Sequence, residues 1–320
     1  MNHLQALKNR INGPIYSIVT PFNPKNDDID YQSLEKYLDT VYLAGGRIFY
    51  IMGYNSRLGQ LSWEETKTLN TFVTKMVKGF RDDTVAIAAA PLHCSTATCI
   101  DFCRHADAIG ADMISLIFLE RLYSNEQIIK HYTMCAAATD MGILIHEMDL
   151  GSGFGNFSVK WPIEVLDILA DVPTIIAIKE DAKDFAYTNE VLARIKDRMA
   201  IIHSGGGKRA WLKFADAGCH AWLNGIGIFE PRLASLFWTA FTVGDKALCS
   251  RITDEIETPF FEKIVHVYGW HIAIKAALEV CGHMSRHDRM PLMPVHDADA
   301  QNIKQIMDSL PIAEIVQGLR

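Results

Sequence analysis

The sequence predicts an α/β protein in which a (β/α)8 TIM barrel is followed by a C-terminal helical region. Three observations lead to this fold class. Eight apolar runs of strand length recur along the chain, segments with helical start signals lie between them, and strand starts are about twenty to forty residues apart, as in βα units. A doubly wound open sheet competes with the barrel, but no Gly-x-Gly-x-x-Gly pattern opens an early helix.

The elements follow in order along the chain. Residues 1–12 are expected to form a short helical extension. The runs that we predict to be buried parallel strands are 15–19, 48–52, 84–89, 113–118, 142–145, 174–178, 199–202 and 221–223. Among the intervening helices, one begins at Ser62 with Glu65 and another at Ser124 with Gln127. Both pairs fit the capping box, in which side chains satisfy the first free N–H groups of a helix.

The rhythm of strands stops after about residue 245. Helical periodicity continues in residues 251–262, 269–281 and 297–309. A barrel of this kind typically spans about 250 residues. We therefore predict an N-terminal extension of residues 1–12, a barrel of residues 13–245, and a C-terminal helical region of residues 246–320.

Composition narrows the classes of function. With 320 residues, 49% of them hydrophobic, the chain can bury one large core and an accessory region. The net charge of −7 and the lack of a basic cluster argue against a nucleic-acid partner. No apolar run approaches the roughly twenty residues that span a bilayer, and the first residues lack the layout of a signal peptide. We expect a cytoplasmic protein with no membrane partner.

The seven cysteines are an odd number and are spread through predicted helices and strands, which indicates reduced thiols. Cys99 and Cys103 share a helix face, and His93 and Cys94 lie just upstream. Because no Cys-x-x-Cys pair accompanies them, we interpret these cysteines as core or helix-face residues rather than zinc ligands.

Lys179 is the most informative residue. It closes the apolar run 174–178, and removal of an amine from water favours its neutral form. A neutral amine in an apolar pocket is the nucleophile that Schiff-base chemistry with a carbonyl substrate requires. In the competing interpretation, Lys179 lies one residue past the buried segment and pairs with Glu180 or Asp181.

Other candidates follow from the fold, because catalytic groups of such barrels lie at the C-terminal ends of the strands. These positions are Thr20, Gly53, Tyr54, Asn55, Pro91, Glu120, His146, Glu147, Lys179, Ser204, Gly205, Gly206, Gly207, Asn224 and Gly225. They include an amine, an imidazole and carboxylates, with glycines that allow close backbone approach. His146, Glu147 and Asp149 are an alternative group of metal ligands, but no repeated spacing requires one, so we expect no metal. The glycines before Lys208 fit either a phosphate-binding loop or a plain loop.

Several motifs, in order, resemble those of the dihydrodipicolinate synthase and N-acetylneuraminate lyase family of class I aldolases. They run from Gly-Pro-Ile-Tyr-Ser-Ile-Val-Thr-Pro-Phe at residues 13–22, through Leu-Ser-Trp-Glu-Glu at 61–65, to Lys-Ala-Ala-Leu at 275–278 and Arg-Met-Pro-Leu at 289–292. The sequence Ile-Lys-Glu around Lys179 looks like the family's Schiff-base lysine motif. The resemblance implies a (β/α)8 barrel with added helices, usually a homotetramer, and an imine with a 2-oxo acid such as pyruvate.

The chain also departs from this family. Gly-Tyr-Asn-Ser-Arg at residues 53–57 stands where the family commonly has Gly-Thr-Thr-Gly-Glu, which holds the substrate carboxylate. Alignment through Leu144 places His146 at the family's catalytic tyrosine. Glu120 falls where synthases have a tyrosine that reaches a neighbouring subunit, and Gly151 falls at a basic position. We therefore expect that this chain is not a true dihydrodipicolinate synthase.

The strand-end positions and the resemblance together predict roles for individual residues. Lys179 is the expected nucleophile and His146 the expected proton shuttle, because imidazole titrates near neutrality. A purely structural histidine is the alternative. The expected substrate-binding residues are Tyr54, Asn55, Glu120, Asn224 and Gly225, and Arg57 is expected to pair with the substrate or with Glu120. Tyr54 turned outward as a packing residue remains an equal alternative.

The sequence thus predicts a cofactor-free Schiff-base lyase or aldolase, with dehydratase chemistry as a variant. Its substrates would be a 2-oxo acid, such as pyruvate or a sugar-acid derivative, and an aldehyde. The assembly would be a homodimer or homotetramer. The alternative is a non-catalytic or regulatory descendant of the barrel that binds a small anionic ligand.

Overall fold

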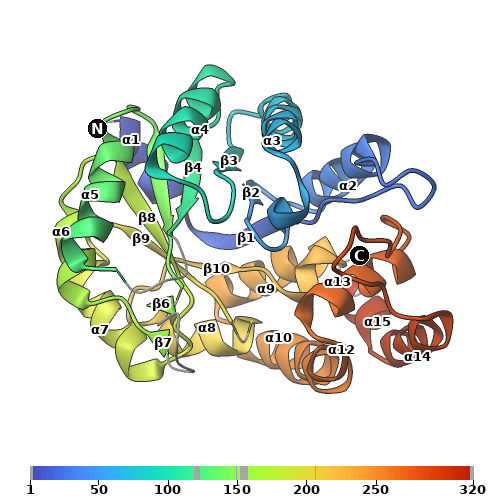
Figure 1. Ribbon diagram of the computed structural model, residues 1–320. Coiled ribbons are helices and arrows are strands. Elements are labelled where there is room, and N and C mark those ends of the chain that lie inside the picture. Colours follow the sequence, from blue (N-terminus) through green and yellow to red (C-terminus); the bar gives the residue numbers. More distant parts are fainter. Residues whose placement is uncertain (1–2, 119–122, 149, 152–157, 206, 318–320) are drawn as a thin grey trace. The chain divides into compact units, whose positions relative to one another are not determined.

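The computed structural model describes residues 3–118, 123–148, 150–151, 158–205 and 207–317. Eight parallel strands close into a barrel, with helices between successive strands and further helices after the last (Figure 1). The predicted (β/α)8 barrel with a C-terminal helical region is therefore confirmed.

The barrel strands occupy the runs expected from the sequence. They are β1 Gly13–Ile18, β2 Ile48–Ile51, β3 Val85–Ala89, β4 Met113–Ile117, β5 Gly142–His146, β8 Ile175–Glu180, β9 Ala200–His203 and β10 Ala221–Leu223. Their order around the barrel is β1-β10-β9-β8-β5-β4-β3-β2. Strand β8 extends through Lys179, which therefore lies inside the strand and not beyond it. A short antiparallel pair, β6 Leu150–Gly151 and β7 Ser158–Val159, was not predicted.

Among the described residues, nine helices run from the N-terminal segment to the end of the barrel, and the first of them, α1, lies where a helix was expected within residues 1–12. Their bounds are α1 His3–Arg10, α2 Tyr31–Leu43, α3 Trp63–Lys78, α4 Thr96–Ala108, α5 Asn125–Ala136, α6 Ile163–Ala170, α7 Phe185–Ile195, α8 Gly207–Ala215 and α9 Pro231–Val243. Both predicted capping boxes are present. The Ser62 hydroxyl accepts a hydrogen bond from the Glu65 N–H at 3.1 Å, and Ser124 accepts one from Gln127 at 3.2 Å.

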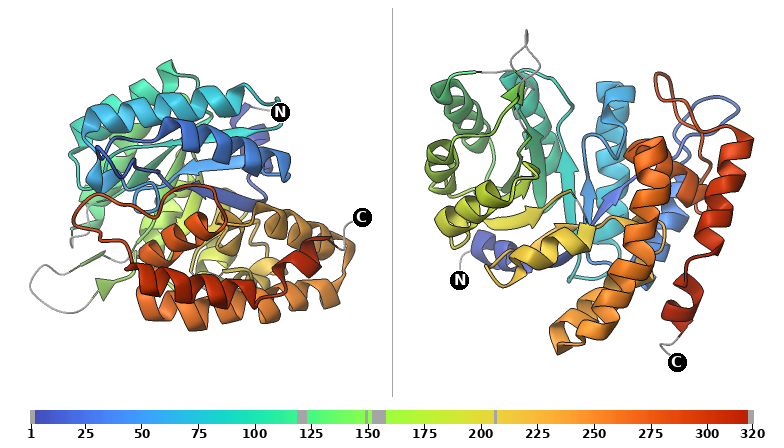
Figure 2. Two further views of the ribbon diagram at one scale, coloured as in Figure 1. Left: turned by 90° about the vertical axis from the view of Figure 1, so that its right-hand side faces the viewer. Right: turned by 90° about the horizontal axis from the view of Figure 1, so that it is seen from below.

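The C-terminal region contains more helix than predicted. A continuous helical run comprises α10 Lys246–Ser250, the π-helical η3 Arg251–Glu257, α11 Thr258–Phe260, the π-helical η4 Phe261–Val265 and α12 His266–Tyr268. Pro259 lies between the π segments, as expected where a ring without an N–H disturbs regular α-helical bonding. Gly269, at a φ of 79°, ends the run. Helices α13 Trp270–Val280 and α14 Asp297–Asp308 then lie side by side (Figure 2), and α15 Ile312–Gln317 was not predicted.

The contacts divide the chain into two compact units, and the division falls within β1. Unit one comprises residues 1–15, 48–53 and 61–223, and unit two comprises residues 16–47, 54–60 and 224–320. Each unit is described by itself below. The predicted boundaries after residues 12 and 245 stay a prediction.

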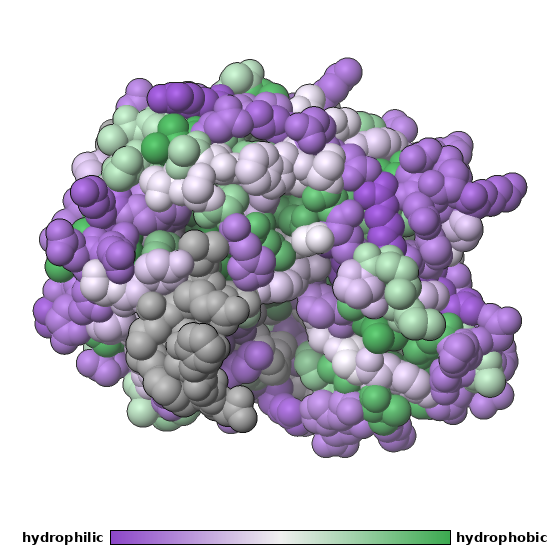
Figure 3. Space-filling view, viewed as in Figure 1, coloured by the Kyte–Doolittle hydropathy of each residue, from purple (hydrophilic) through white to green (hydrophobic). Residues whose placement is uncertain are grey.

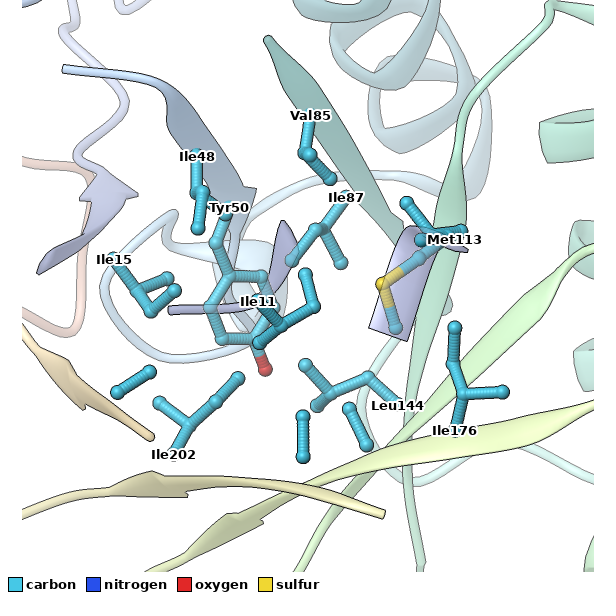
Figure 4. Packing of buried hydrophobic residues seen from close by; sticks show 14 of the residues in the cluster. Ile11, Ile15, Ile48, Tyr50, Val85, Ile87, Met113, Leu144, Ile176 and Ile202 are labelled. Atoms are coloured by element: carbon cyan, nitrogen blue, oxygen red, sulfur yellow. The ribbon is translucent and has the colours of Figure 1, made fainter. Parts of the chain in front are cut away.

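Unit one has an apolar core to which its strands and α1 contribute. Figure 4 shows the ring of Tyr50, from β2, among aliphatic side chains that include Ile11 from the N-terminal segment and Ile87 from β3. Full burial of one such aliphatic side chain stabilises the fold by about 1.5–3 kcal/mol. Because this core holds the strands in register, the polar side chains at their C-terminal ends have defined neighbours.

One view of the molecule shows the distribution of polar residues on its surface. On the face of the molecule in Figure 3, hydrophilic residues predominate and hydrophobic residues lie in small groups between them. Within the described ranges, no helix has the length and apolar character needed to cross a membrane.

Candidate active site

Lys179 is buried in the barrel wall of unit one. Its side chain is almost fully enclosed, and the register of β8 against β5 places it beside His146. The Lys179 Nζ donates a hydrogen bond to Asp181 Oδ2 at 2.9 Å. The two interpretations of Lys179, a buried amine and a partner of Asp181, both describe it in part, because the side chain is enclosed and also paired.

Glu180, the other carboxylate considered as a partner, makes different contacts. Successive side chains of a strand point to opposite sides, so Glu180 is directed away from Lys179. Its Oε2 accepts a hydrogen bond at 2.7 Å from the hydroxyl of Thr188, a residue of α7. Glu180 thus connects the strand to its following helix and leaves Asp181 as the counter-ion.

His146 ends β5, and its ring lies next to the Tyr50 hydroxyl, which in turn contacts the Ser115 hydroxyl. Its Nδ1 lies 3.4 Å from the Tyr50 hydroxyl, which lies 2.7 Å from the Ser115 hydroxyl. In the described part of the chain, the buried Nε2 of His146 has no hydrogen-bond partner. The three side chains come from β5, β2 and β4, and they form a short relay between neutral groups.

Tyr50 was missed by the sequence analysis. The sequence signal that could have identified it is its hydroxyl, a hydrogen-bonding group within the otherwise apolar run of β2. Burial raises the pKa of Tyr50 well above its ordinary value, so the phenol stays protonated and can donate. It is therefore a second candidate for proton transfer beside His146.

The protonation of His146 differs from the expectation. Burial, and secondly the charge of Lys179, lower the pKa of His146 well below its ordinary value, while Asp181 opposes this change. The assumption that this imidazole titrates near neutrality is wrong for this environment. The ring is neutral at physiological pH, so it can accept a proton during a reaction without first losing one.

Asp181 and Glu147 complete the surroundings of Lys179. Burial tends to raise the pKa of Asp181, but the charge and hydrogen bond of Lys179 outweigh it and lower that pKa below its ordinary value. Glu147 is fully buried, and its Oε2 accepts a hydrogen bond from the backbone N–H of Asp181 at 3.1 Å. The Glu147 N–H donates to the Lys179 carbonyl at 3.1 Å. Glu147 thus fixes the backbone that carries the ion pair.

The alternative metal group of His146, Glu147 and Asp149 gains no support. Asp149 lies outside the described residues. Among those that the structure describes, His146 and Glu147 do not belong to a group of three side chains at metal-binding distances.

Four of the expected substrate-binding residues belong to unit two. Asn55 is fully buried; its Nδ2 donates to the Ser17 hydroxyl at 2.8 Å, and its Oδ1 accepts from the Trp270 indole at 2.9 Å. Tyr54 is half-buried and lies 6.2 Å from the ring of His271. Both side chains have packing or hydrogen-bonding partners within unit two, and their substrate contacts stay a prediction.

The remaining expected residues are Asn224, Gly225 and Glu120. Asn224 is buried and precedes Gly225, which leads into the 3-10 turn η2 Ile226–Ile228. A Cβ atom at Gly227 would lie only 2.1 Å from the Asn224 Nδ2, so only glycine allows this side chain to lie over the turn. Glu120 lies outside the described residues.

Arg57 also belongs to unit two and has a different partner from the one expected. Its Nε and Nη2 donate to the carboxylate of Asp288 at 3.0–3.1 Å. Lys275 lies 3.7 Å from the same carboxylate, and burial lowers the pKa of Lys275 to about 8 although Asp288 opposes this. Arg57 is thus part of a buried ion cluster with Asp288 and Lys275, and its expected pairing with the substrate or Glu120 stays a prediction.

We expect the Arg57→Met variant to lose about 3–5 kcal/mol of unfolding free energy, because a buried carboxylate would lose its main partner. Both side chains of the Arg57–Asp288 pair are at most 4% exposed. Arg251→Met is the matched control. Arg251 is 41% exposed and pairs with Glu255 and Glu314, so solvent screens these pairs and its loss should cost much less than the loss of Arg57. Chemical denaturation measures the unfolding free energy of both variants. Equal losses would show that the buried cluster stabilises the fold no more than the exposed ion pairs do.

Known proteins share sequence and fold with this chain. The model of the Dihydrodipicolinate synthetase family matches residues 10–310. The 4-hydroxy-tetrahydrodipicolinate synthase of Staphylococcus haemolyticus is 24% identical over 305 residues, which cover 93% of this chain and 97% of that protein. The synthase of the same name from Desulforamulus reducens is 25% identical over 297 residues, covering 92% and 96%.

Solved structures show the same fold. The 4-hydroxy-tetrahydrodipicolinate synthase of Methylacidiphilum fumariolicum SolV superposes with a TM-score of 0.82 at 20% identity, covering 96% of this chain and 98% of that one. A prophage protein of the dihydrodipicolinic acid synthase family from E. coli K12, solved in complex with pyruvate, also has a TM-score of 0.82. It is 18% identical, and the match covers 94% and 99% of the two chains.

Proposed function

Because the chain belongs to the dihydrodipicolinate synthetase family, we propose that it is a class I lyase or aldolase in which Lys179 forms an imine with a 2-oxo acid. The observation that carries this proposal is the buried Lys179, held 2.9 Å from Asp181 and beside the neutral His146. A buried amine with an adjacent carboxylate can lose its proton locally and then attack a carbonyl carbon.

The proposed reaction proceeds through a protonated imine. The neutral Lys179 amine adds to the ketone carbon, the carbinolamine loses water, and the iminium withdraws electrons from the neighbouring carbon. A bond between C3 and C4 can then break or form through the enamine. His146 and Tyr50 are placed to move the protons that these steps require, because their ring nitrogen and hydroxyl lie 3.4 Å apart.

Pyruvate is the first substrate to test. The prophage protein from E. coli was solved with pyruvate, and it has the same fold at 18% identity, so its ligand supports the choice of probe. The proposed second substrate is an aldehyde, and dehydratase chemistry and sugar-acid derivatives are included in the same proposal. We further propose a cytoplasmic homodimer or homotetramer that needs no cofactor.

Borohydride trapping tests this function directly. Incubation of the intact protein with pyruvate and borohydride should add the mass of one reduced pyruvyl group, and peptide mapping should locate it on Lys179. A wild-type protein that stays unmodified with saturating pyruvate and with larger 2-oxo acids would overturn the imine mechanism.

We also expect that the chain does not synthesise dihydrodipicolinate. The reason is the replacement of family residues by Tyr54, Glu120 and Gly151. Aspartate semialdehyde and pyruvate should give no product above background, with the Staphylococcus haemolyticus synthase as the positive control. Turnover within tenfold of about 10 per second, a typical enzyme rate, would contradict this expectation.

The second candidate function is a non-catalytic barrel that binds a small anion. The ion pair between Lys179 and Asp181 favours it, because a lysine held by a neighbouring carboxylate can have a structural role. Calorimetric binding of pyruvate without any borohydride adduct would support this candidate over the lyase.

A further inference from the structure

A cluster of metal-binding side chains lies outside the Lys179 site, between α4 and α5 of unit one. Cys99 comes from α4, and His131 and Cys135 come from α5, the neighbouring helix in Figure 1. One sulfur or nitrogen atom from each residue lies within 4.8 Å of the other two, and all three residues are buried. From the sequence, Cys94, Cys99 and Cys103 were interpreted as core or helix-face residues, because His131 and Cys135 lie on the next helix and their proximity was not visible.

Cys94 supplies a fourth group. Its sulfur lies 3.4 Å from the Cys99 sulfur, in the loop between β3 and α4. Three cysteines and one histidine are a common ligand set for zinc in proteins. His131 and Cys135 are four residues apart and therefore lie on one face of α5.

His131 has the hydrogen bonding of a metal ligand. Its side chain is 8% exposed, and its Nδ1 lies 2.9 Å from the Thr96 hydroxyl. Its buried Nε2 has no hydrogen-bond partner in the part of the chain that the structure describes. A buried polar atom without a partner is unfavourable, and a bound cation would satisfy it. Metal-bound histidines usually hydrogen-bond through their second nitrogen, which is the part Thr96 would play.

The cluster can be reached from solvent. A pocket of about 370 Å³ borders it, lined by residues that include Cys94, Thr96, Phe118, His131 and Met134. An ion entering this pocket would meet Cys94 and His131 first.

We propose that Cys99, His131 and Cys135, joined by Cys94, bind one thiophilic metal ion such as Zn²⁺. Two sulfurs on a tetrahedral zinc ion lie about 3.8 Å apart, as follows from a Zn–S bond of about 2.3 Å. The ligand atoms of Cys99, His131 and Cys135 lie within 4.8 Å of one another and need to close by about 1 Å to reach that geometry. Cys94 is outside this group of three, so its side chain would have to move to join it. Binding would release the three thiol protons to solvent and would change no oxidation state.

Metal titration of the full-length protein tests the site. The reduced, chelator-treated protein should take up one Zn²⁺ ion per chain, measured by elemental mass spectrometry after dialysis, and zinc should raise its melting temperature. Co²⁺ should give thiolate-to-metal charge-transfer bands and the intense visible bands of tetrahedral cobalt. Absence of stoichiometric zinc together with absence of these bands would overturn the proposal.

Substitutions locate the site. Cys99→Ser, Cys135→Ser and His131→Asn should each weaken zinc binding at least about 100-fold, and Thr96→Val should weaken it about 10- to 100-fold. Cys249→Ser and Cys281→Ser are matched controls far along the sequence, and both should bind as the wild type does. Melting curves without metal establish that each variant is folded. If the controls lose as much affinity as the ligand variants, or if the ligand variants retain it, zinc does not bind at this cluster.

Discussion

Substituting Lys179 with alanine should abolish the borohydride adduct with pyruvate and lower turnover of any 2-oxo acid substrate by at least about 10⁴-fold. The physical reason is that Lys179 is the amine buried in β8 beside His146 and paired with Asp181. Intact-protein and peptide mass spectrometry measure the adduct, and steady-state kinetics measure the turnover.

Two further variants test whether the adduct is lost because the protein is destabilised, or because any lysine has been removed. Loss of Lys179 leaves Asp181 without its counter-ion, which could destabilise the fold. The melting temperature of Lys179→Met, which keeps the side-chain length, should therefore be compared with those of Lys179→Ala and the wild type. Lys67→Ala removes a partly exposed lysine that pairs with Asp101, and it should leave the adduct unchanged. An adduct that survives in folded Lys179→Ala protein would place the imine on another lysine.

The second large effect concerns His146. His146→Gln should lower kcat by about 10²–10⁴-fold and leave borohydride trapping at least partly intact, because attack by the amine precedes most of the proton transfer. Glutamine retains hydrogen bonding toward Tyr50 but cannot carry a proton between substrate atoms. Full turnover in His146→Gln with an identified substrate would make the histidine structural.

The pH dependence gives an independent measure of the same residue. Because burial and Lys179 lower the pKa of His146, protonation of its ring on acidification should occur below the ordinary imidazole value of about 6.5. The acid limb of kcat/KM that disappears in His146→Gln should therefore lie below that pH. Tyr50→Phe removes the hydroxyl beside Nδ1 and should lower kcat without removing that limb. An acid limb near 6.5 that vanishes with His146 would contradict the effect of burial.

The sequence by itself was sufficient for the barrel. The eight apolar runs became eight strands, and the two capping boxes began the helices that they predicted. The burial of Lys179 was also expected from the sequence, because a charged residue at the end of an apolar run is conspicuous. These features depend on side chains only a few residues apart, whose spacing is directly visible in the chain.

The partners of the polar residues were decided by the tertiary structure. Arg57 pairs with Asp288, which is 231 residues away, and Tyr50 contacts His146, which is 96 residues away. Cys99 likewise meets His131 and Cys135 only because α4 packs beside α5. Periodicity shows which side of a strand or helix is buried, but the choice of partner depends on distances between elements that are remote in sequence. The same burial sets the pKa of His146, so its neutral state at physiological pH was not visible in the order of residues.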